Sequence, residues 1–503
     1  MRLFRILAAL AGASTMAMAQ TNAPLKVRQL SLQDCIEVAL EHNLDLQIGR
    51  YGPKISLYNL NAAYGAYDPS LTLLGQHIHS ESGSQILGGG FLIQPAGSDE
   101  NNFSAGIGGT SPWGTTYNIQ GSANDTYGTG QGSTFENSLA TASFRLTQPL
   151  LKNFWIDNNR LTIRVAKNRL KYSSLTLKLQ VMQTITRLEQ AYYDLIYNRE
   201  NLIVQQKAVE LAERLVAENK KRLEVGALAP LDLQSVEAQA ASTRAQVILA
   251  QSQLGTQERV VKQLLTDQFR DWADVSIEPT GKLKAPAPVV NRQDSWGKGL
   301  SERPELLQAK LDVEKQGIQL KYDKNQLYPE LDALFNYGYN GASSKIFGSG
   351  GEFSDAFNDF QQLNRRSYTY GGQITIPLSN VRARNAYRAD RASLQQILLT
   401  LKQLEQNIMI AIDNDIGTLL ANYDQVQATR AAREYEEAAL DAEQKKLESG
   451  KSTTYTVLQV QRDLTTARGN EIQALDNYLK SLSQLSLDEG STLYRLNINF
   501  EAN

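Results

Sequence analysis

Side chains that could perform covalent or metal chemistry are scarce in this chain of 503 residues, which contains three histidines and one cysteine. His77 and His79 have the spacing of two metal ligands on one strand face, but a zinc site needs further ligands, so a structural role near a loop is favoured. Asp413 and Asp415 could act as acid and base, yet the apolar residues beside them follow a helical seam, which favours a solvated or lumen-facing position. No Ser-His-Asp, Cys-His or metal constellation is recognisable, and we therefore predict that the chain is not an enzyme.

Recognisable motifs for cofactors or nucleic acid are also missing from the sequence. Gly88–Gly90 precedes neither a lysine nor the start of a helix, which favours a flexible loop over a phosphate-binding loop. The single cysteine, Cys35, can form no internal disulfide and is far from the position of a lipid-anchor cysteine. A net charge of −2 gives no reason to expect a nucleic-acid partner. We expect no cofactor, no metal and no nucleic acid.

Two heptad ladders indicate the elements that dominate the chain. A seven-residue apolar repeat winds helices into a left-handed coiled coil, so each ladder predicts a long helix that packs along other helices. The first contains no proline between positions 158 and 225 and would be roughly 100 Å long at 1.5 Å per residue. The second is interrupted only at Arg433. The ladders consist of Val181, Leu188, Leu195, Leu202, Val209, Val216 and Leu223, and of Ile412, Leu419, Val426, Leu440 and Leu447.

Each ladder ends at a glycine that opens a shorter heptad stretch, which predicts a helix, a tip turn and a returning helix. Gly226 and Gly450 are 224 positions apart, so a tandem duplication is the economical interpretation. The turns could be helix hairpins and nothing more, or they could have a functional role. The candidate residues at the tips are Arg222, Val225, Gly226, Pro230, Ser449 and Gly450.

Strands with alternating side chains follow a helical segment in each half. The helical segments, residues 32–66 and 300–326, align at an offset of 260 and are ended by Pro69 and Pro329. An extra hairpin is offered by residues 103–127 in the first half, with a possible turn at 111–114. A period of two predicts strands at 140–146, 331–339 and 368–378, and Gly-, Ser- and Asn-rich composition predicts loops at 83–102, 123–137 and 341–364.

The N-terminus has the features of an export signal, because Arg2 and Arg5 precede an apolar stretch and small residues at 17 and 19 suit cleavage. No later run of 18 apolar residues appears, which excludes a membrane-spanning helix and leaves a closed β-barrel as the means of insertion. Aromatic residues in the strands and at the hairpin turn suit membrane interfaces, with core packing between strands as the alternative. These residues are Trp113, Tyr337, Tyr339, Tyr368 and Tyr370.

The number of strands requires several copies of the chain. Each half is predicted to contribute two strands, and the extra hairpin would add to these four. Such a number cannot close a barrel alone, because the smallest membrane barrels have about eight. We therefore predict a mainly α fold with β, in which a cyclic homo-oligomer shares one membrane β-barrel that is continued by a long coiled-coil tunnel. The internal two-fold repeat divides the chain into a signal peptide (1–19), a first repeat (20–268), a linker (269–299) and a second repeat (300–503).

Several local motifs resemble the TolC-like outer-membrane efflux protein family. Leu30 to Leu46 is similar to the opening motif, LSL-x-x-A-I ending in N-P-x-L, although Cys35 and Leu44 replace its small residue and its proline. Thr147-Gln148-Pro149-Leu150-Leu151 resembles the exit from the strands, and Arg222-Leu223-x-Val225-Gly226 with Asp232 resembles the tip turn. The resemblance covers nearly the whole mature chain.

The resemblance implies a homotrimer with a twelve-stranded barrel in the lipid of the outer membrane and a twelve-helix tunnel in the periplasm. It implies a passive duct of a tripartite efflux or type I secretion system, which carries small molecules or proteins and whose tips meet a periplasmic adaptor that links it to an inner-membrane transporter. Family members can place two aspartates six and nine residues after the second tip glycine, where this chain has Thr456 and Gln459. Asp232 is therefore the expected entrance charge.

Two other classes of protein remain open from the sequence. A structural envelope coiled coil without transport activity would use the heptads but would conduct no ions. A secreted hydrolase that relies on carboxylates would be a compact soluble monomer.

Overall fold

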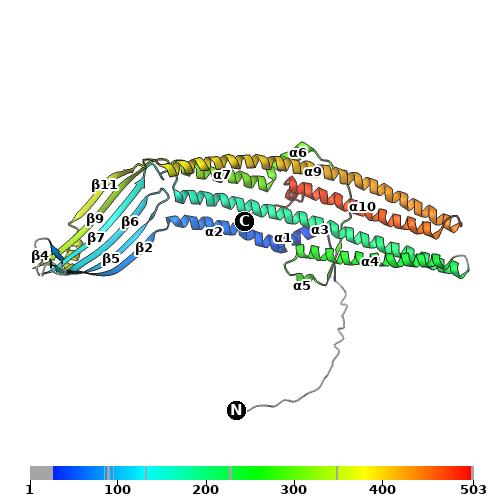
Figure 1. Cartoon of the computed structure of the whole chain (residues 1–503), viewed down its shortest axis with the longest axis horizontal. Helices are drawn as coiled ribbons and strands as arrows, with labels where there is room; N and C mark the ends of the chain where they lie inside the picture. Colours follow the sequence, from blue (N-terminus) through cyan, green and yellow to red (C-terminus); the bar gives the residue numbers. More distant parts are fainter. Residues whose placement is uncertain are drawn as a thin grey trace, which may run out of the picture. The chain divides into compact units, whose positions relative to one another are not determined.

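The computed structural model describes residues 26–83, 85–87, 91–93, 96–130, 133–225, 229–346 and 349–499, so the predicted signal peptide, Gly88–Gly90 and Gly226 lie outside the described residues. The chain divides into two compact units. The first unit is Met1–Asp45, Thr184–Pro288 and Thr418–Gln484, and the second is Leu46–Gln183, Val289–Gly417 and Leu485–Asn503. The two longest helices, α3 (Asn158–Glu224) and α9 (Val381–Glu448), contribute residues to both units (Figure 1). They coincide with the heptad ladders, which confirms the two long helices.

The second unit is built on one antiparallel sheet. The strands follow the order β10-β9-β7-β6-β5-β2, and β11 is a further partner of β9. A short ladder of β3 (Gln85–Leu87) and β4 (Phe91–Ile93) is separate from this sheet. The predicted strands at 140–146 and 331–339 are confirmed, and the one at 368–378 ends at Thr375. The strand bounds are β2 Ser70–Ser82, β5 Ala96–Thr110, β6 Thr116–Gly130, β7 Ser133–Pro149, β9 Glu330–Ile346, β10 Ser349–Gly350 and β11 Arg366–Thr375.

The sheet extends into segments whose composition suggested loops. β5 begins at Ala96, β6 continues to Gly130 and β9 continues to Ile346, so the loop prediction is wrong for parts of all three segments. The physical reason is that ladder hydrogen bonds join main-chain groups, which Gly, Ser and Asn carry like any other residue. Where a neighbouring strand continues, the hydrogen bonds to it outweigh the low strand propensity of these residues.

The extra hairpin predicted at 103–127 is present as β5 and β6, and both strands belong to the sheet. Its turn lies at the predicted place, where the Gly114 N–H donates to the Ser111 carbonyl at 2.9 Å. Gly114 has φ +83°, a conformation that favours glycine. Since β10 has two residues, the sheet contains six long strands, four from the first half and two from the second.

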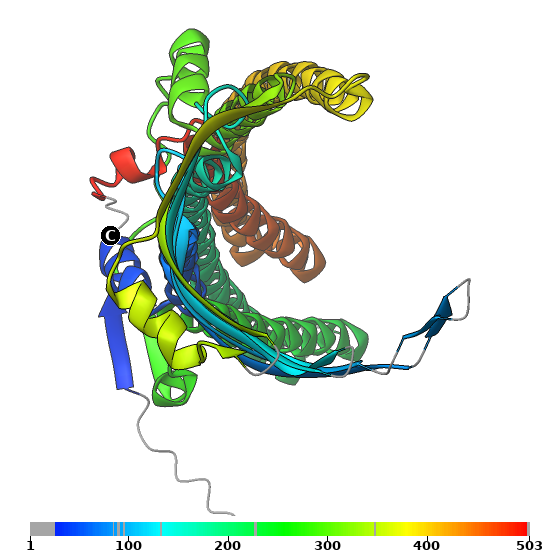
Figure 2. The same ribbon diagram turned by 90° about the vertical axis from the view of Figure 1, so that its left-hand side faces the viewer.

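The sheet is curved, and its strands follow an arc when seen in Figure 2. The short helix α8 (Phe353–Gln361), yellow-green in that view, lies on the convex side of the arc. A Cβ atom at Gly341 would collide with the Ala356 carbonyl oxygen, so α8 covers the face to which that Cβ points. Side chains alternate along a strand, so Tyr337 and Tyr339 share this face. The convex face therefore carries the predicted interface tyrosines of β9.

The helices that precede the sheet strands are interrupted once in each half. The first predicted helix is divided into α1 (Leu32–His42) and α2 (Leu44–Tyr64), followed by η1 (Gly65–Tyr67). The second is divided into α6 (Arg292–Glu302) and α7 (Pro304–Asn325). The breaks at Asn43 and Arg303 are 260 positions apart, the offset that aligned the two segments in the sequence. Pro53 lies inside α2.

The first unit combines helices with a parallel strand pair that the sequence did not predict. The pair joins β1 (Lys26–Leu30) to β8 (Val275–Pro279), and the Tyr192 hydroxyl donates to the Leu30 carbonyl at 3.0 Å. Seam residues Leu188, Leu195 and Leu419 are fully buried, as the heptads predicted. The remaining helices are α4 (Pro230–Leu265), α5 (Phe269–Trp272) and most of α10 (Thr454–Asp488) here, while the end of α10 and α11 (Thr492–Arg495) belong to the second unit. In the described part of the chain, no helix is long and apolar enough to cross a membrane.

Candidate functional site

Two helix hairpins in the first unit form the candidate site, which we call the tips. In the first hairpin, α3 ends at Glu224 and α4 begins at Pro230. Proline suits the first helical position because an N–H there would have no partner within the helix. In the second hairpin, α9 ends at Glu448 and α10 begins at Thr454.

Gly450 ends the long helix α9 by a local hydrogen-bond pattern. Its φ is +72°, and its N–H donates to the Leu447 carbonyl at 3.1 Å. The next residue, Lys451, donates its N–H to the Lys446 carbonyl at 2.8 Å. These two bonds satisfy carbonyl groups that the helix end would leave without partners. The glycine is therefore required by the backbone of the turn.

One apolar cluster brings the two hairpins together. It contains residues of α3, α4, α9 and α10, so both tips share a core. A buried hydrogen bond crosses the same region, where the Thr454 hydroxyl donates to the Asn219 side-chain oxygen at 3.1 Å. The buried members are Leu215, Val236, Leu440, Leu447, Val457, Leu458 and Leu464.

The predicted tip residues lie on the surface around this shared core. Val225 is 78% exposed, Arg222 is half-buried, and Pro230, Ser449 and Gly450 are exposed. The predicted entrance charge, Asp232, is exposed in the first turn of α4. A carboxylate at this position favours the helix, because the N-terminus carries a partial positive charge.

Two exposed apolar residues at the tips were missed by the sequence interpretation. Leu231 is 74% exposed and Tyr455 is 66% exposed, and they occupy the second positions of α4 and α10. Both are apolar residues at positions outside the heptad seams. That combination was the signal in the sequence that could have identified them. Together with Val225 they place apolar surface at both tips.

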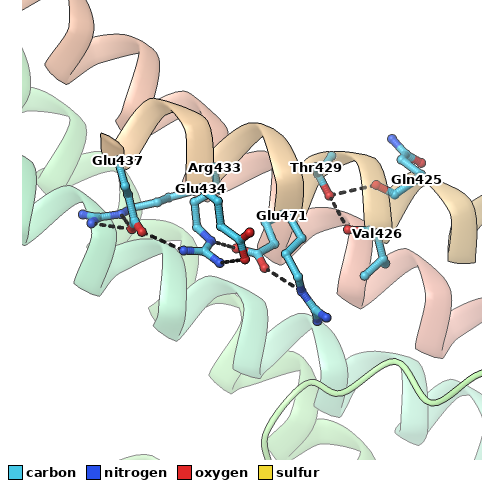
Figure 3. Close-up of polar contacts among 9 residues, drawn as sticks. Gln425, Val426, Thr429, Arg433, Glu434, Glu437 and Glu471 are labelled. Atoms are coloured by element: carbon cyan, nitrogen blue, oxygen red, sulfur yellow. Dashed lines mark hydrogen bonds and ion pairs between the residues drawn. The ribbon is translucent and has the colours of Figure 1, made fainter. Parts of the chain in front are cut away.

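Arg433, the residue that interrupts the second ladder, is the centre of an ion-pair network between α9 and α10 (Figure 3). Its guanidinium contacts Glu471 at 2.5 Å and Glu437 at 2.8 Å. Arg468 also contacts Glu437 at 2.8 Å, and Arg430 contacts Glu471 at 3.4 Å. The seam position is thus filled by a charged side chain whose partners come from both helices of the hairpin.

A second polar cluster, in the second unit, corrects the expectation for Asp415. This residue was expected to be solvated or to face a lumen, but its Oδ2 atom is buried without a hydrogen-bond partner. Burial and a hydrogen bond with Asp488 raise the pKa of the Asp415 carboxyl to about 7. Arg303 contacts Asp488 at 3.0 Å, while Asp413 contacts Arg292 at 3.0 Å. Asp413 and Asp415 therefore have different partners and form no acid–base pair.

The histidines His77 and His79 lie on β2, beside β5. Asp99 of β5 contacts His79 Nδ1 at 2.7 Å and His77 Nε2 at 3.4 Å. Asp99 lies 20 residues from His79 in sequence, and only the register between the strands brings them together. Among the described residues no group of three or more His, Cys, Asp or Glu could hold a metal ion.

The predicted interface aromatics fall into two groups. Tyr337 and Tyr339 have hydroxyl groups 2.9 Å apart, and Tyr368 pairs with Tyr337 in the register of β9 and β11. Tyr370 is 77% exposed on β11. Trp113 is 76% exposed and lies apart from them, in the turn between β5 and β6. Their contact with a membrane interface stays a prediction.

Comparison with known proteins identifies similar sequences and folds. The family model described as Outer membrane efflux protein matches residues 114–266 and 297–487. The outer membrane protein TolC of Vibrio cholerae is 23% identical over 354 residues, which cover 70% of this chain and 76% of that protein. The outer membrane protein VceC of Vibrio cholerae has a TM-score of 0.63 at 18% identity, covering 93% of this chain and 97% of VceC. The open MtrE outer membrane channel of Neisseria gonorrhoeae has a TM-score of 0.63 at 14% identity, covering 92% of this chain and 89% of MtrE.

Proposed function

We infer the function of this chain from the family to which it belongs, the outer membrane efflux protein family. The family match includes both halves of the chain, and the solved relatives share its fold over nearly its whole length. The chain is thus an outer-membrane duct of the efflux type with a helical tunnel in the periplasm.

The finer proposal is that three copies share one barrel in the outer membrane. Its main support is the convex face of the sheet. Phe103, in the same row of cross-strand partners as Gly341, is 58% exposed, and Tyr370, on the same face of β11 as Tyr368, is 77% exposed. Large exposed apolar faces are rare on water-soluble proteins, whereas a bilayer covers such a face. In the described sheet, β2 and β11 each pair with one strand, so the next copy would supply the second partner.

We further propose that the tips receive a periplasmic adaptor, which connects the duct to an inner-membrane transporter. Exposed apolar side chains of Val225, Leu231 and Tyr455 support this contact, because helices of a partner could bury them. The duct would carry small molecules or proteins passively, and the transporter would supply the energy. We also propose that residues 1–19 are a signal peptide and that residues 20–268 and 300–503 are the two repeats.

A structural coiled coil without transport is the second candidate. It accounts for the buried seams of α3 and α9, but it gives no role to a curved sheet with an apolar convex face. Catalysis is not part of the proposal, since the family is one of channels.

The test is the isolation of the protein from outer-membrane fractions in detergent, followed by mass measurement and planar-bilayer recording. We expect a trimer that conducts ions. A trimer without conductance would favour the structural coiled coil. A monodisperse soluble monomer in buffer without detergent would contradict the outer-membrane duct.

A further inference from the structure

We propose that the hairpin β5–β6 is part of the membrane wall, so that three copies of six strands form an eighteen-stranded barrel wide enough for bulky cargo. This inference rests on the proposed function, and it differs from the twelve strands that the family resemblance implied. The six strands are contributed by β2, β5, β6, β7, β9 and β11.

The register of the sheet places the hairpin in phase with the other strands. Cross-strand partners share a face, so a row of partners shows which side chains lie together. One row crosses all six strands and is apolar or aromatic throughout: Leu71, Ile107, Ile119, Phe144, Tyr337 and Tyr368. The neighbouring row, which points to the opposite face, contains only polar residues and glycine: Thr72, Gly106, Gln120, Ser143, Gly338 and Ser367.

This agreement across the strands is what a membrane wall requires. A slip of one residue would move the apolar side chains of a strand to the opposite face. If the hairpin folded away from the wall, its apolar side chains would not need to lie on the same face as Phe144. Ile107 is 46% exposed and Ile119 is 55% exposed, although both lie in the middle of an extended sheet. Their exposure is explained if lipid covers them.

The curvature of the sheet points the same way. Tyr337 belongs to the apolar row and lies on the convex face, which α8 covers near Gly341. The apolar row therefore faces outward and the polar row faces the inside of the arc. A closed membrane barrel that contains water has this arrangement.

Two added strands also leave the topology intact. The two strands of a hairpin run in opposite directions. The direction of edge strand β2 relative to edge strand β11 is therefore the same with and without the hairpin. With β5 and β6 removed, β2 could pair directly with β7. Barrel diameter grows roughly in proportion to strand number, so eighteen strands give a barrel about 1.5 times as wide as twelve.

Labelling of adjacent cysteines tests whether both faces of the hairpin are placed as proposed. In a Cys35→Ala background, Phe103→Cys and Ile119→Cys should react with a lipid-dissolved maleimide and resist a water-soluble one. Ser104→Cys and Gln120→Cys should react with the water-soluble reagent. The control pair on β7 is Phe144→Cys and Ser143→Cys, in the same rows as Ile119 and Gln120.

The control separates two kinds of failure. If adjacent positions on β5, β6 and β7 alternate between reaction with the lipid-dissolved and the water-soluble maleimide, the eighteen-stranded wall is supported. Alternation on β7 alone would overturn the inference about the hairpin and leave the duct intact. Loss of alternation on β7 as well would show that the proposed membrane insertion itself is wrong.

A deletion tests the consequence for cargo size. Removal of residues 97–129 joins Ala96 to Gly130 and should leave twelve strands in a trimer. The radius of the largest polyethylene glycol that enters from the loop side should fall by about one third. An unchanged size limit in a conducting trimer would overturn the inference, and if the deletion variant does not assemble, the labelling pattern still decides it.

Discussion

The Nε atom of Arg433 lies 2.5 Å from Oε2 of Glu471, so an ion pair between α9 and α10 replaces an apolar contact in the heptad seam. Arg433 is 23% exposed and Glu471 is 14% exposed, which places the pair between surface and interior. A charge in such a position is tolerated only with partners, and Glu437 supplies another at 2.8 Å. The interruption of the ladder is therefore compensated within the hairpin.

Removing one partner of this network should destabilise the hairpin. Arg433→Ala leaves Glu471 poorly solvated and without its shortest ion pair, so we expect the free energy of unfolding to fall by about 1–3 kcal/mol, between the values for exposed and buried pairs. Thermal unfolding in detergent, followed by circular dichroism, measures this. The double variant Arg433→Leu with Glu471→Leu restores an apolar seam and should be more stable than the single variant. Equal loss in both would contradict a compensated charge.

Long repeats were the part of the fold that the sequence predicted best. The heptads recur from Val181 to Leu223 and from Ile412 to Leu447, inside helices of 67 and 68 residues, so a local exception such as Arg433 does not obscure them. The β1–β8 pair was missed because each strand has five residues and Lys26 pairs with Val275, far away in the chain. Five residues carry too little periodicity to reveal such a pairing.

The partner of Arg433 could have been found from the position of the tip turn. Arg433 and Glu471 each lie nineteen residues from Ser452 in the turn, so antiparallel helices bring them to the same level. The same symmetry brings Asp415 close to Asp488. Burial of one Asp415 oxygen could not be read from the sequence, because it depends on how neighbouring helices cover that level.

The Asp415 carboxyl predicts a stability that decreases as pH rises. Its pKa is about 7 in the fold and 3.8 in a solvated reference, so the protonated group stabilises the fold fully below about pH 4 and loses that contribution as pH rises to 7. Asp415→Asn should therefore raise the unfolding temperature at pH 8 and change it little at pH 4. Thermal scans across this pH range measure the effect.

The control for this pH dependence is Asp424→Asn, an exposed aspartate on the same helix α9. It should leave the pH profile unchanged. Burial also raises the pKa of Asp323 and that of Asp476 to about 6, so the Asp415 variant should reduce the slope without abolishing it. If the slope of unfolding temperature against pH is unchanged in Asp415→Asn, this carboxyl is ionised over the whole pH range of the scans.

Two glycines of the second hairpin should respond in opposite directions to substitution by alanine. Gly450 has φ +72°, so Gly450→Ala should cost about 1–2 kcal/mol although no atom would meet its Cβ. Gly469 lies inside α10, where a Cβ also meets no atom, so Gly469→Ala should stabilise by about 0.5–1 kcal/mol. Unfolding temperatures in detergent compare the two. A loss of stability in both variants would indicate that a neighbouring copy of the chain crowds the Gly469 position, since no atom of the single chain would meet a Cβ there.

The entrance charge gives the last prediction. Asp232 is exposed in the first turn of α4, and the positions that can carry aspartates in the second tip of family members hold Thr456 and Gln459. Three copies of one carboxylate give a weaker field than six, because like charges sum at a narrow mouth. We expect modest selectivity for cations and weak block by multivalent cations in planar bilayers. Asp232→Asn should reduce the ratio of potassium to chloride permeability, while the exposed control Asp294→Asn should not. Strong block by a micromolar trivalent cation that persists in Asp232→Asn would show that a different set of carboxylates controls entry.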